Sequence, residues 1–351
     1  MKKKIINAMD IHVGGGLTYL LLLHSYMDSE ENIILLDNRV KNKIPYLKKA
    51  KTIFLKKGPF RSIRIFIFRL KFYIKQYCNK KNKLNIDNFI EIYLNGIPPF
   101  FRFYYSKVKV YIFIQNRLFF VKKVNNLNSF INIKIYLRIF ISKFFLNLFL
   151  RKNDILVSQT NTMKNILLNA YKFNKIINQE KLWGNFNFIK IENTIKNSQT
   201  IDFNLINLIE NLSKENILLF YPADFYEHKN HINLIEAINL LNTEKIKKFK
   251  LILTINNSDI SSITNKNFEN IILIGRLKYI DILQIYKIVD YLIFPSYVES
   301  YGLPLIEAKY NDLKIISSKL DYVYDVCHPF KVFDPFDKFD IFKNIYSILK
   351  K

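Results

Sequence analysis

The sequence predicts an α/β protein with two domains, each built on a parallel sheet whose two faces are covered by helices. Short apolar runs alternate with helical patterns along the chain, which is typical of parallel strands joined by crossover helices. The 351 residues exceed the usual size of one hydrophobic core. Apolar periodicity lapses near residues 190–200. We therefore expect a first domain at residues 1–195 and a second at residues 196–351, whose last helix is free to pack back on the first domain.

The first domain is expected to open with a strand at residues 4–9 and a helix at residues 17–27. Between them lie three consecutive glycines, Gly14, Gly15 and Gly16. Glycine at a strand-to-helix junction lets a ligand or a facing domain approach the backbone closely, although a flexible turn has the same composition. Further strands are predicted at residues 33–36, 111–114 and 155–158.

The predicted strand at residues 111–114 ends in polar residues that include Asn116 and Arg117. Both are candidate contacts for an acceptor or a sugar, and ordinary loop polarity explains them equally well.

The second domain repeats the alternation of strands and helices. Strands are predicted at residues 217–221, 250–253, 271–274 and 291–294. Helical patterns start near residues 230, 279, 305 and 339.

The most informative segment follows the predicted strand at residues 291–294. Two carboxylates, Glu299 and Glu307, stand eight positions apart around a Gly-Leu-Pro turn. A strand, a glycine-bearing loop and a helix N-terminus present backbone N–H groups to an anion. Phosphate needs such N–H groups and sugar hydroxyls need carboxylate acceptors, so this segment offers both. The alternative is two solvated residues flanking an ordinary strand–helix turn.

This segment resembles the family 4 retaining glycosyltransferases of the GT-B fold, in which Glu-x7-Glu surrounds Ser-Tyr-Gly-Leu-Pro after a Phe-Pro-Ser strand end. The resemblance implies two Rossmann-like domains facing across a cleft that binds a nucleotide-sugar donor. It implies that Glu307 contacts the ribose and that the glycine loop faces the donor diphosphate. It also implies a group of contacts to the sugar-phosphate: Glu299, Ser300, Tyr301, Gly302 and Leu303.

A second segment, around Asp224 and Lys229, ends the first predicted strand of the second domain. It resembles the family segment in which a lysine before a helix neutralises the donor diphosphate, and Lys229 matches that lysine. Asp224 stands where the family usually has an arginine, a variation shared by sequences of the His-Lys-Asn-His type. Arg276 is a possible substitute for the missing cation. Lys229 and Glu299 are the candidate catalytic residues.

No metal or other cofactor is expected. No Asp-x-Asp pair follows a predicted strand to hold a nucleotide-bound divalent ion. His228 and His231 have a spacing that zinc could use, but no Cys/His set accompanies them, so packing at a helix start is favoured. The leaving-group charge would then be met by Lys229, helix dipoles and backbone N–H groups.

The formal net charge of +25 implies an anionic partner: a membrane surface, an acidic substrate or nucleic acid. Wound as a helix, residues 61–77 place Arg61, Arg64, Lys71 and Lys75 on one side and apolar residues on the other, which is typical of an interfacial membrane helix and also of an ordinary surface helix. Residues 130–150 have charges spread around the helix, so we expect them to be partly buried rather than to lie in a membrane interface. No run of about 18 uncharged apolar residues exists.

We therefore expect a cytoplasmic enzyme, peripheral at the inner face of the membrane, which moves a hexosyl-type sugar from a nucleotide-sugar to a surface glycan or lipid-linked acceptor. This is the chemistry of polysaccharide and lipopolysaccharide biosynthesis. An epimerase-like relative of the same fold and a non-catalytic sugar-nucleotide binder remain alternatives. A nucleic-acid-binding protein is disfavoured, because the lysines are dispersed and no recognition motif appears.

Overall fold

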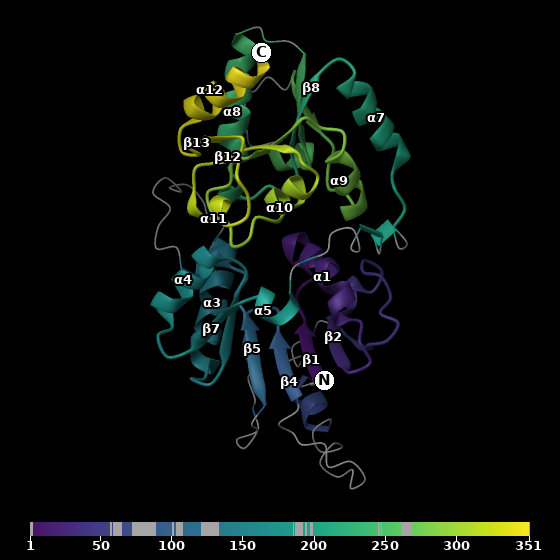
Figure 1. Ribbon diagram of the computed structural model, residues 1–351, viewed down its shortest axis with the longest axis vertical. Helices are drawn as coiled ribbons and strands as arrows, with labels where there is room; N and C mark the ends of the chain where they lie inside the picture. The colour runs from purple at the N-terminus through teal and green to yellow at the C-terminus, as the bar shows by residue number, and fades with distance from the viewer. Residues whose placement is uncertain are drawn as a thin grey trace. The chain divides into compact units, whose positions relative to one another are not determined.

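The computed structural model describes residues 3–56, 58, 65–71, 89–99, 102, 108–120, 133–184, 186, 192–193, 195–196, 199–244, 246, 248–260 and 269–350. The chain divides into two compact units, Met1–Ser198 and Gln199–Lys351. The sequence placed the boundary after residue 195. Each unit is built on one parallel sheet with helices packed on it (Figure 1).

The N-terminal unit contains a seven-stranded sheet in the order β3-β2-β1-β4-β5-β6-β7, and every pairing in it is parallel. Its strands are β1 (Lys3–Ala8), β2 (Asn32–Asp37), β3 (Lys51–Leu55), β4 (Phe89–Tyr93), β5 (Lys109–Phe113), β6 (Ile155–Ser158) and β7 (Lys175–Asn178). Its helices include α1 (Gly14–Met27), α3 (Ile133–Phe149), α4 (Asn161–Ala170) and α5 (Glu180–Trp183), with short 3-10 turns η1 (Asn38–Val40) and η3 (Arg117–Phe119).

The C-terminal unit contains a six-stranded parallel sheet in the order β10-β9-β8-β11-β12-β13. Its strands are β8 (Ile217–Tyr221), β9 (Phe249–Leu253), β10 (Ile271–Leu273), β11 (Tyr291–Phe294), β12 (Lys314–Ser318) and β13 (Lys331–Phe333). Its helices are α7 (Phe203–Ser213), α8 (His231–Thr243), α9 (Tyr279–Ile285), α10 (Leu303–Tyr310), α11 (Asp321–Tyr324) and α12 (Lys338–Leu349), with 3-10 turns η4 (Glu227–Lys229) and η5 (Asn257–Ile260). The last helix, α12, packs on α8 and β13 of its own unit.

The strand orders fix where a ligand can bind. In each sheet the order reverses beside the first strand, between β1 and β4 in one unit and between β8 and β11 in the other. Loops that leave the carboxyl ends of two such strands diverge to opposite sides, which opens a crevice at the sheet edge. The functional residues predicted after β1, β8 and β11 therefore lie at these two switch points.

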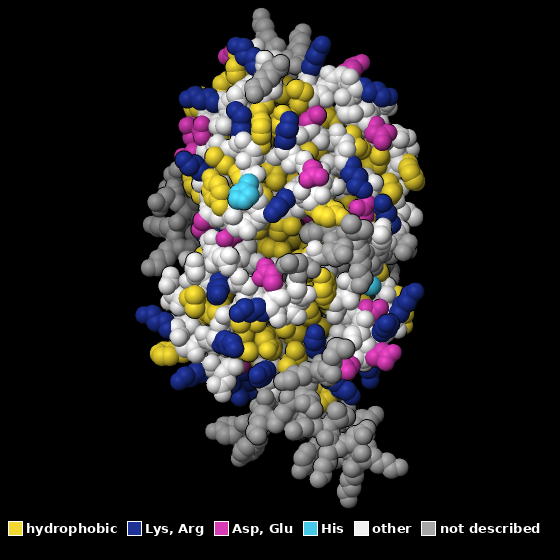
Figure 2. Space-filling view, viewed as in Figure 1, with side chains coloured by type: hydrophobic (Ala, Val, Ile, Leu, Met, Phe, Trp, Pro, Cys, Tyr) yellow, Lys and Arg dark blue, Asp and Glu magenta, His cyan; other side chains and the backbone are white. Residues whose placement is uncertain are grey.

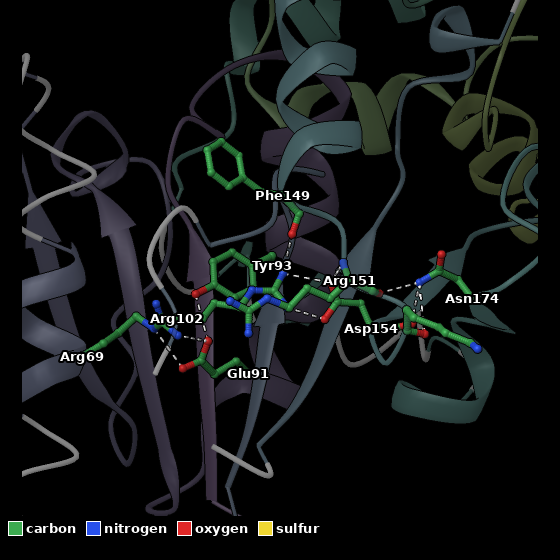
Figure 3. A network of polar contacts seen from close by, with 9 residues as sticks. Arg69, Glu91, Tyr93, Arg102, Phe149, Arg151, Asp154 and Asn174 are labelled. Carbon is green, nitrogen blue, oxygen red and sulfur yellow. Dashed lines mark hydrogen bonds and ion pairs between the residues drawn. The ribbon is translucent and has the colours of Figure 1, made fainter. Parts of the chain in front are cut away.

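The strands form because their residues are apolar on both faces, as a sheet covered on both sides requires. All five residues of β4 are buried, including Glu91. Figure 3 shows how this buried carboxylate is neutralised: Arg69 binds both of its oxygens, each at 2.9 Å, and the Tyr93 hydroxyl donates to one of them at 2.9 Å. A second buried pair lies nearby, in which Arg102 binds both oxygens of Asp154.

Arg69 belongs to the part of the predicted amphipathic helix that the structure describes, residues 65–71, which are helical. The side facing the core carries Ile65, Phe68 and the buried Arg69. Ile67 lies on the predicted apolar side, yet it is exposed. Within residues 65–71 the prediction is therefore wrong at Ile67, whereas Lys71 is exposed as expected. Nothing local in the sequence indicates that Arg69 pairs with Glu91. Arg61, Arg64 and Lys75 lie outside the described residues.

Candidate functional site

The two predicted catalytic side chains meet at the switch point of the C-terminal sheet. Lys229 ends the 3-10 turn η4 on the loop after β8, and Glu299 lies on the loop after β11. The Lys229 Nζ atom donates to the Glu299 Oε1 atom at 2.5 Å. The side chains are only 18% and 13% exposed, so this charge-assisted contact is largely shielded from water. An ammonium and a carboxylate are thus held together at the mouth of the sheet.

The two loops are joined by hydrogen bonds that the sequence did not reveal. The Tyr221 hydroxyl donates to the Lys229 carbonyl at 2.8 Å and also contacts Ser296 Oγ at 2.9 Å. The buried Asn230 side chain, whose backbone is left-handed with φ of 60°, donates to the Pro295 carbonyl at 3.1 Å. The one signal of this arrangement in the sequence was the asparagine directly after Lys229, because Asn adopts the αL conformation more readily than most residues do.

Gly302 begins the helix that follows Glu299. It caps α10 with φ of 69°, a conformation that glycine adopts without steric cost, and no side chain caps the helix there. Pro304 occupies the first turn, where its missing N–H is harmless. Ser300, Tyr301 and Leu303 are half-buried beside Gly302. The α10 N-terminus therefore presents backbone N–H groups close to Glu299 in sequence.

Glu307 lies one turn further along α10 and is buried. Its Oε1 atom accepts a hydrogen bond from the Tyr279 hydroxyl at 2.8 Å, and its Oε2 atom accepts one from the Tyr286 hydroxyl at 3.0 Å. Burial raises the pKa of Glu307 to about 7, and the two tyrosine hydrogen bonds oppose that rise. Both tyrosines come from α9 and the residue after it. The sequence analysis missed them because nothing in their spacing relates them to Glu307.

Asp224 and Arg276 form a pair after β8 and β10. The Arg276 Nε atom lies 3.0 Å from the Asp224 Oδ1 atom, and the guanidinium is 65% exposed. Gly275 positions Arg276 with φ of 70°, and a Cβ there would lie 2.9 Å from Asn256 Oδ1. Asp224 thus pairs with the Arg276 guanidinium at the ends of β8 and β10.

The two histidines are packed rather than solvated. The His231 ring lies against Tyr221 and Phe225, and burial lowers its pKa to about 3. His228 stacks on Tyr226, and burial lowers its pKa to about 4. Both imidazoles are therefore neutral at physiological pH. Among the described residues, no group of three His, Cys, Asp or Glu side chains is arranged to hold a metal ion.

In the N-terminal unit the glycine loop follows β1 at the switch point. Gly14, Gly15 and Gly16 form the first turn of α1, and Val13 before them provides no side-chain cap. A Cβ on Gly16 would lie 3.1 Å from the Ile11 side chain. Gly14 and Gly15 are exposed, so their N–H groups face outward at a helix N-terminus.

Asn116 and Arg117 lie after β5. The Asn116 side chain accepts from the Leu118 N–H at 3.0 Å and caps η3, which Arg117 begins. A cluster that the sequence analysis missed lies after β2, where Arg39 binds both Asp37 oxygens and its Nη1 atom contacts His12 Nε2 at 2.8 Å. Arg39 holds the pKa of Asp37 down at about 2. The signal was a pair of opposite charges immediately after an apolar run.

Comparison with solved structures identifies the class of fold. Anabaena HepE in complex with UDP and glucose has a TM-score of 0.61 at 12% identity, with 100% of this chain and 90% of that chain covered. WaaG, a glycosyltransferase involved in lipopolysaccharide biosynthesis, has a TM-score of 0.62 at 13% identity, with 99% and 90% covered. Sucrose-phosphate synthase from Thermosynechococcus elongatus has a TM-score of 0.62 at 15% identity, with 100% and 90% covered. The predicted GT-B fold, with two Rossmann-like parallel-sheet units, is confirmed.

The C-terminal unit is identified more closely. Residues 204–351 match the family model of the glycosyl transferases group 1, and this range contains Asp224, Lys229, Arg276, Glu299 and Glu307. No curated protein sequence matches the chain. The group 1 domain and the GT-B fold together support a glycosyltransferase.

Proposed function

We propose that the protein is a retaining glycosyltransferase that moves a sugar, of hexosyl type, from a nucleotide-sugar donor to a glycan or lipid-linked acceptor without a metal ion. The observation that carries the proposal is the contact between Lys229 and Glu299 at the switch point of the C-terminal sheet. Two loops 70 residues apart in sequence bring a phosphate-binding cation and a hydroxyl-binding carboxylate to one point.

Donor diphosphate would be bound by cations and backbone N–H groups. Lys229 is a compact cation suited to a phosphate oxygen, and it can exchange the Glu299 carboxylate for that oxygen when the donor enters. Arg276 supplies a second cation beside Asp224. The α10 N-terminus adds N–H groups and the positive end of its dipole. The glycine loop at the α1 N-terminus is a separate candidate in the N-terminal unit for the same chemistry.

The sugar and the ribose would be bound by the two carboxylates. Glu299, released from Lys229, accepts hydrogen bonds from sugar hydroxyls, with Ser300, Tyr301, Gly302 and Leu303 beside it. Glu307 would accept the ribose hydroxyls. Each of its oxygens has further lone-pair capacity beside the tyrosine hydrogen bond.

In the transfer itself, the bond between the anomeric carbon and the donor phosphate oxygen breaks, and the acceptor oxygen forms its bond on the same face of the sugar. The acceptor hydroxyl proton passes to the departing phosphate oxygen. Charge on that oxygen is met by Lys229, Arg276 and the α10 N-terminus, in place of a divalent ion. Asn116 and Arg117 are the candidate acceptor contacts.

The neighbours support the substrate classes. HepE was solved with UDP and glucose, and WaaG takes part in lipopolysaccharide biosynthesis. Fold likeness and a cationic chain favour a UDP-sugar donor and an acceptor of the surface-glycan class, at the inner face of the membrane.

Donor binding is tested by a thermal-shift screen of UDP-, GDP-, ADP- and dTDP-sugars, since a ligand that binds the native state raises the melting temperature. One nucleotide-sugar should stabilise the protein, and EDTA should not reduce that effect. Product analysis with the stabilising donor then separates transfer from epimerisation. Binding without turnover of any acceptor would favour a non-catalytic sugar-nucleotide binder.

A further inference from the structure

Helix α3 (Ile133–Phe149) of the N-terminal unit has two apolar sides, and only one of them is covered. Its inner side contributes the fully buried Leu146 to a core cluster, and the partly buried Ile139 packs against that cluster. Its outer side carries five large apolar residues that are each between 42% and 61% exposed: Leu137, Phe140, Ile141, Phe144 and Leu148. At 100° per residue these five lie within an arc of about 100°. They form one stripe along the helix, the α3 stripe.

Arg138 and Lys143, the two charged residues of α3 whose side chains the structure describes, do not interrupt the α3 stripe. Lys143, which weighed against an interfacial helix in the sequence, turns inward: its Nζ atom donates to the Phe119 carbonyl and lies 5.4 Å from the Phe120 ring centroid. Arg138 is exposed at the side of the stripe. Within residues 137–150, α3 is partly buried, as expected, because one side packs on the core and the other is exposed.

Exposed cations continue beyond the helix. Arg151 and Lys152 follow α3, and the Lys152 ammonium lies 5.9 Å from the ring centroid of Phe173, which is 78% exposed. The one acidic residue in the sequence from 133 to 155 is Asp154, which is buried and bound by Arg102. The stripe is therefore bordered by positive charge without exposed carboxylates in this stretch.

We propose that the protein docks on an anionic lipid bilayer through the α3 stripe, with α3 lying in the plane of the interface. An apolar face of Phe and Leu flanked by Arg and Lys suits the boundary between acyl chains and anionic headgroups. No described helix is long and apolar enough to cross a membrane. A second copy of the chain fits less well, because a two-fold contact would bring the cationic borders together without carboxylates to neutralise them.

This inference rests on the proposed function in one respect: membrane binding would bring the enzyme to a lipid-linked acceptor. Lys229, Arg276 and Glu299 lie in the other unit, so membrane binding and donor binding by these residues can fail independently.

The test is co-sedimentation of the full chain with vesicles of phosphatidylglycerol and phosphatidylcholine, beside vesicles of phosphatidylcholine alone. The variant Phe140→Ser/Phe144→Ser removes two aromatic rings from the stripe. The matched control is Phe203→Ser/Leu208→Ser on α7, which removes two similarly exposed side chains that have Asp202 and Glu210 nearby in sequence. All three proteins are checked for an unchanged melting temperature and donor-induced thermal shift.

We expect wild type and the α7 control to bind anionic vesicles alike, more weakly at high salt, and the α3 variant to bind at least roughly tenfold more weakly. Full binding by the α3 variant would assign the contact to another surface and overturn the proposal. So would no binding by wild type, or a dimer in sedimentation velocity that the α3 variant abolishes while vesicle binding persists.

A direct readout uses Phe144→Trp with brominated lipids. The one natural tryptophan, Trp183, is buried, so it gives a constant background. Quenching of the added indole is expected. Emission that brominated lipids leave unchanged in vesicle-bound protein would exclude insertion of the stripe.

Discussion

At the scale of single residues, Lys229 and Glu299 show how two charged side chains of a ligand site can pair with each other before a ligand binds. Each neutralises the other in a largely shielded position. Separating them without a replacement partner costs free energy, since a shielded charge loses its counter-charge. A diphosphate and a sugar supply both replacements at once, so the pair favours a complete donor over free phosphate or free sugar.

Lys229→Ala should lower kcat/KM for the donor by about 100-fold or more, because it removes the cation that meets the leaving-group charge. Steady-state turnover and the donor-induced thermal shift measure the effect. Lys278→Ala is the control, since that lysine binds the Thr200 carbonyl at 3.1 Å on an exposed surface and should leave both quantities unchanged. Equal rates in wild type, Lys229→Ala and Glu299→Ala would end the catalytic assignment.

Glu307 predicts a pH-dependent stability. Its pKa is about 7 in the folded protein and near 4.5 when unfolded, so the folded state binds more protons between these values. The free energy of unfolding should therefore fall as pH rises from 4.5 to 7, by up to roughly 3 kcal/mol.

Glu307→Gln should remove this dependence and be more stable than wild type above pH 7, because the amide carries no charge to desolvate. Urea unfolding at several pH values measures it. Identical pH profiles for the two proteins would show that Glu307 is not the titrating group.

At the scale of elements, the strands that the sequence revealed each contain a run of apolar residues, which is clearest in β8 and β11. Those it missed are atypical in composition or length. β4 contains the buried Glu91, and β12 and β13 begin with a lysine that reads as a loop. β3 likewise begins with Lys51. A short strand with a polar end gives no period to detect, and its pairing comes from neighbours far away in sequence.

The helical segment 65–71 is held on β4 by a buried ion pair. Arg69→Ala should destabilise the N-terminal unit by about 3–5 kcal/mol, because Glu91 would stay buried without its counter-charge. Arg69→Met/Glu91→Leu should recover most of that loss. Lys71→Ala on the exposed side of the segment is the control, and chemical denaturation is the measurement. A loss in the double variant as large as that in Arg69→Ala would contradict this account.

The start of α10 depends on Gly302. Gly302→Ala should lower the melting temperature, since the new Cβ combines a left-handed backbone with a 3.1 Å approach to Leu305 Cδ1. Gly184→Ala is matched to it, with φ of 73° and no atom within 4 Å of the new Cβ. The difference between the two variants isolates the steric contact. We expect the Gly302 variant to lose more stability and to bind donor more weakly.

At the scale of the whole molecule, the net charge of +25 is spread widely. Figure 2 shows lysine and arginine side chains scattered over the face it depicts, with apolar side chains between them. Dispersed charge attracts anionic surfaces at long range without forming a specific groove. Retention of mixed oligonucleotides in filter binding should therefore be weak at near-physiological salt and fall steeply as salt increases. Tight, sequence-selective retention would reverse this expectation.

The sequence predicted the architecture and the residues after β8 and β11, because strand ends, glycine turns and charged loops are local patterns. It did not predict the partners of those residues. The tyrosines that bind Glu307 and the Asn230 that binds Pro295 depend on which strands become neighbours. The same limit applies to α3, because the side of this helix that is exposed depends on which side packs on the core.

The strand order β8–β11 has a practical consequence for studying how this chain folds. Lys229 and Glu299 are brought together only after the chain has formed β9 and β10 on one side of β8 and has returned to pair β11 with the other side. Recovery of nucleotide-sugar affinity during refolding would therefore show when β8 and β11 have paired. Donor binding can therefore be used to follow the assembly of the C-terminal sheet during refolding.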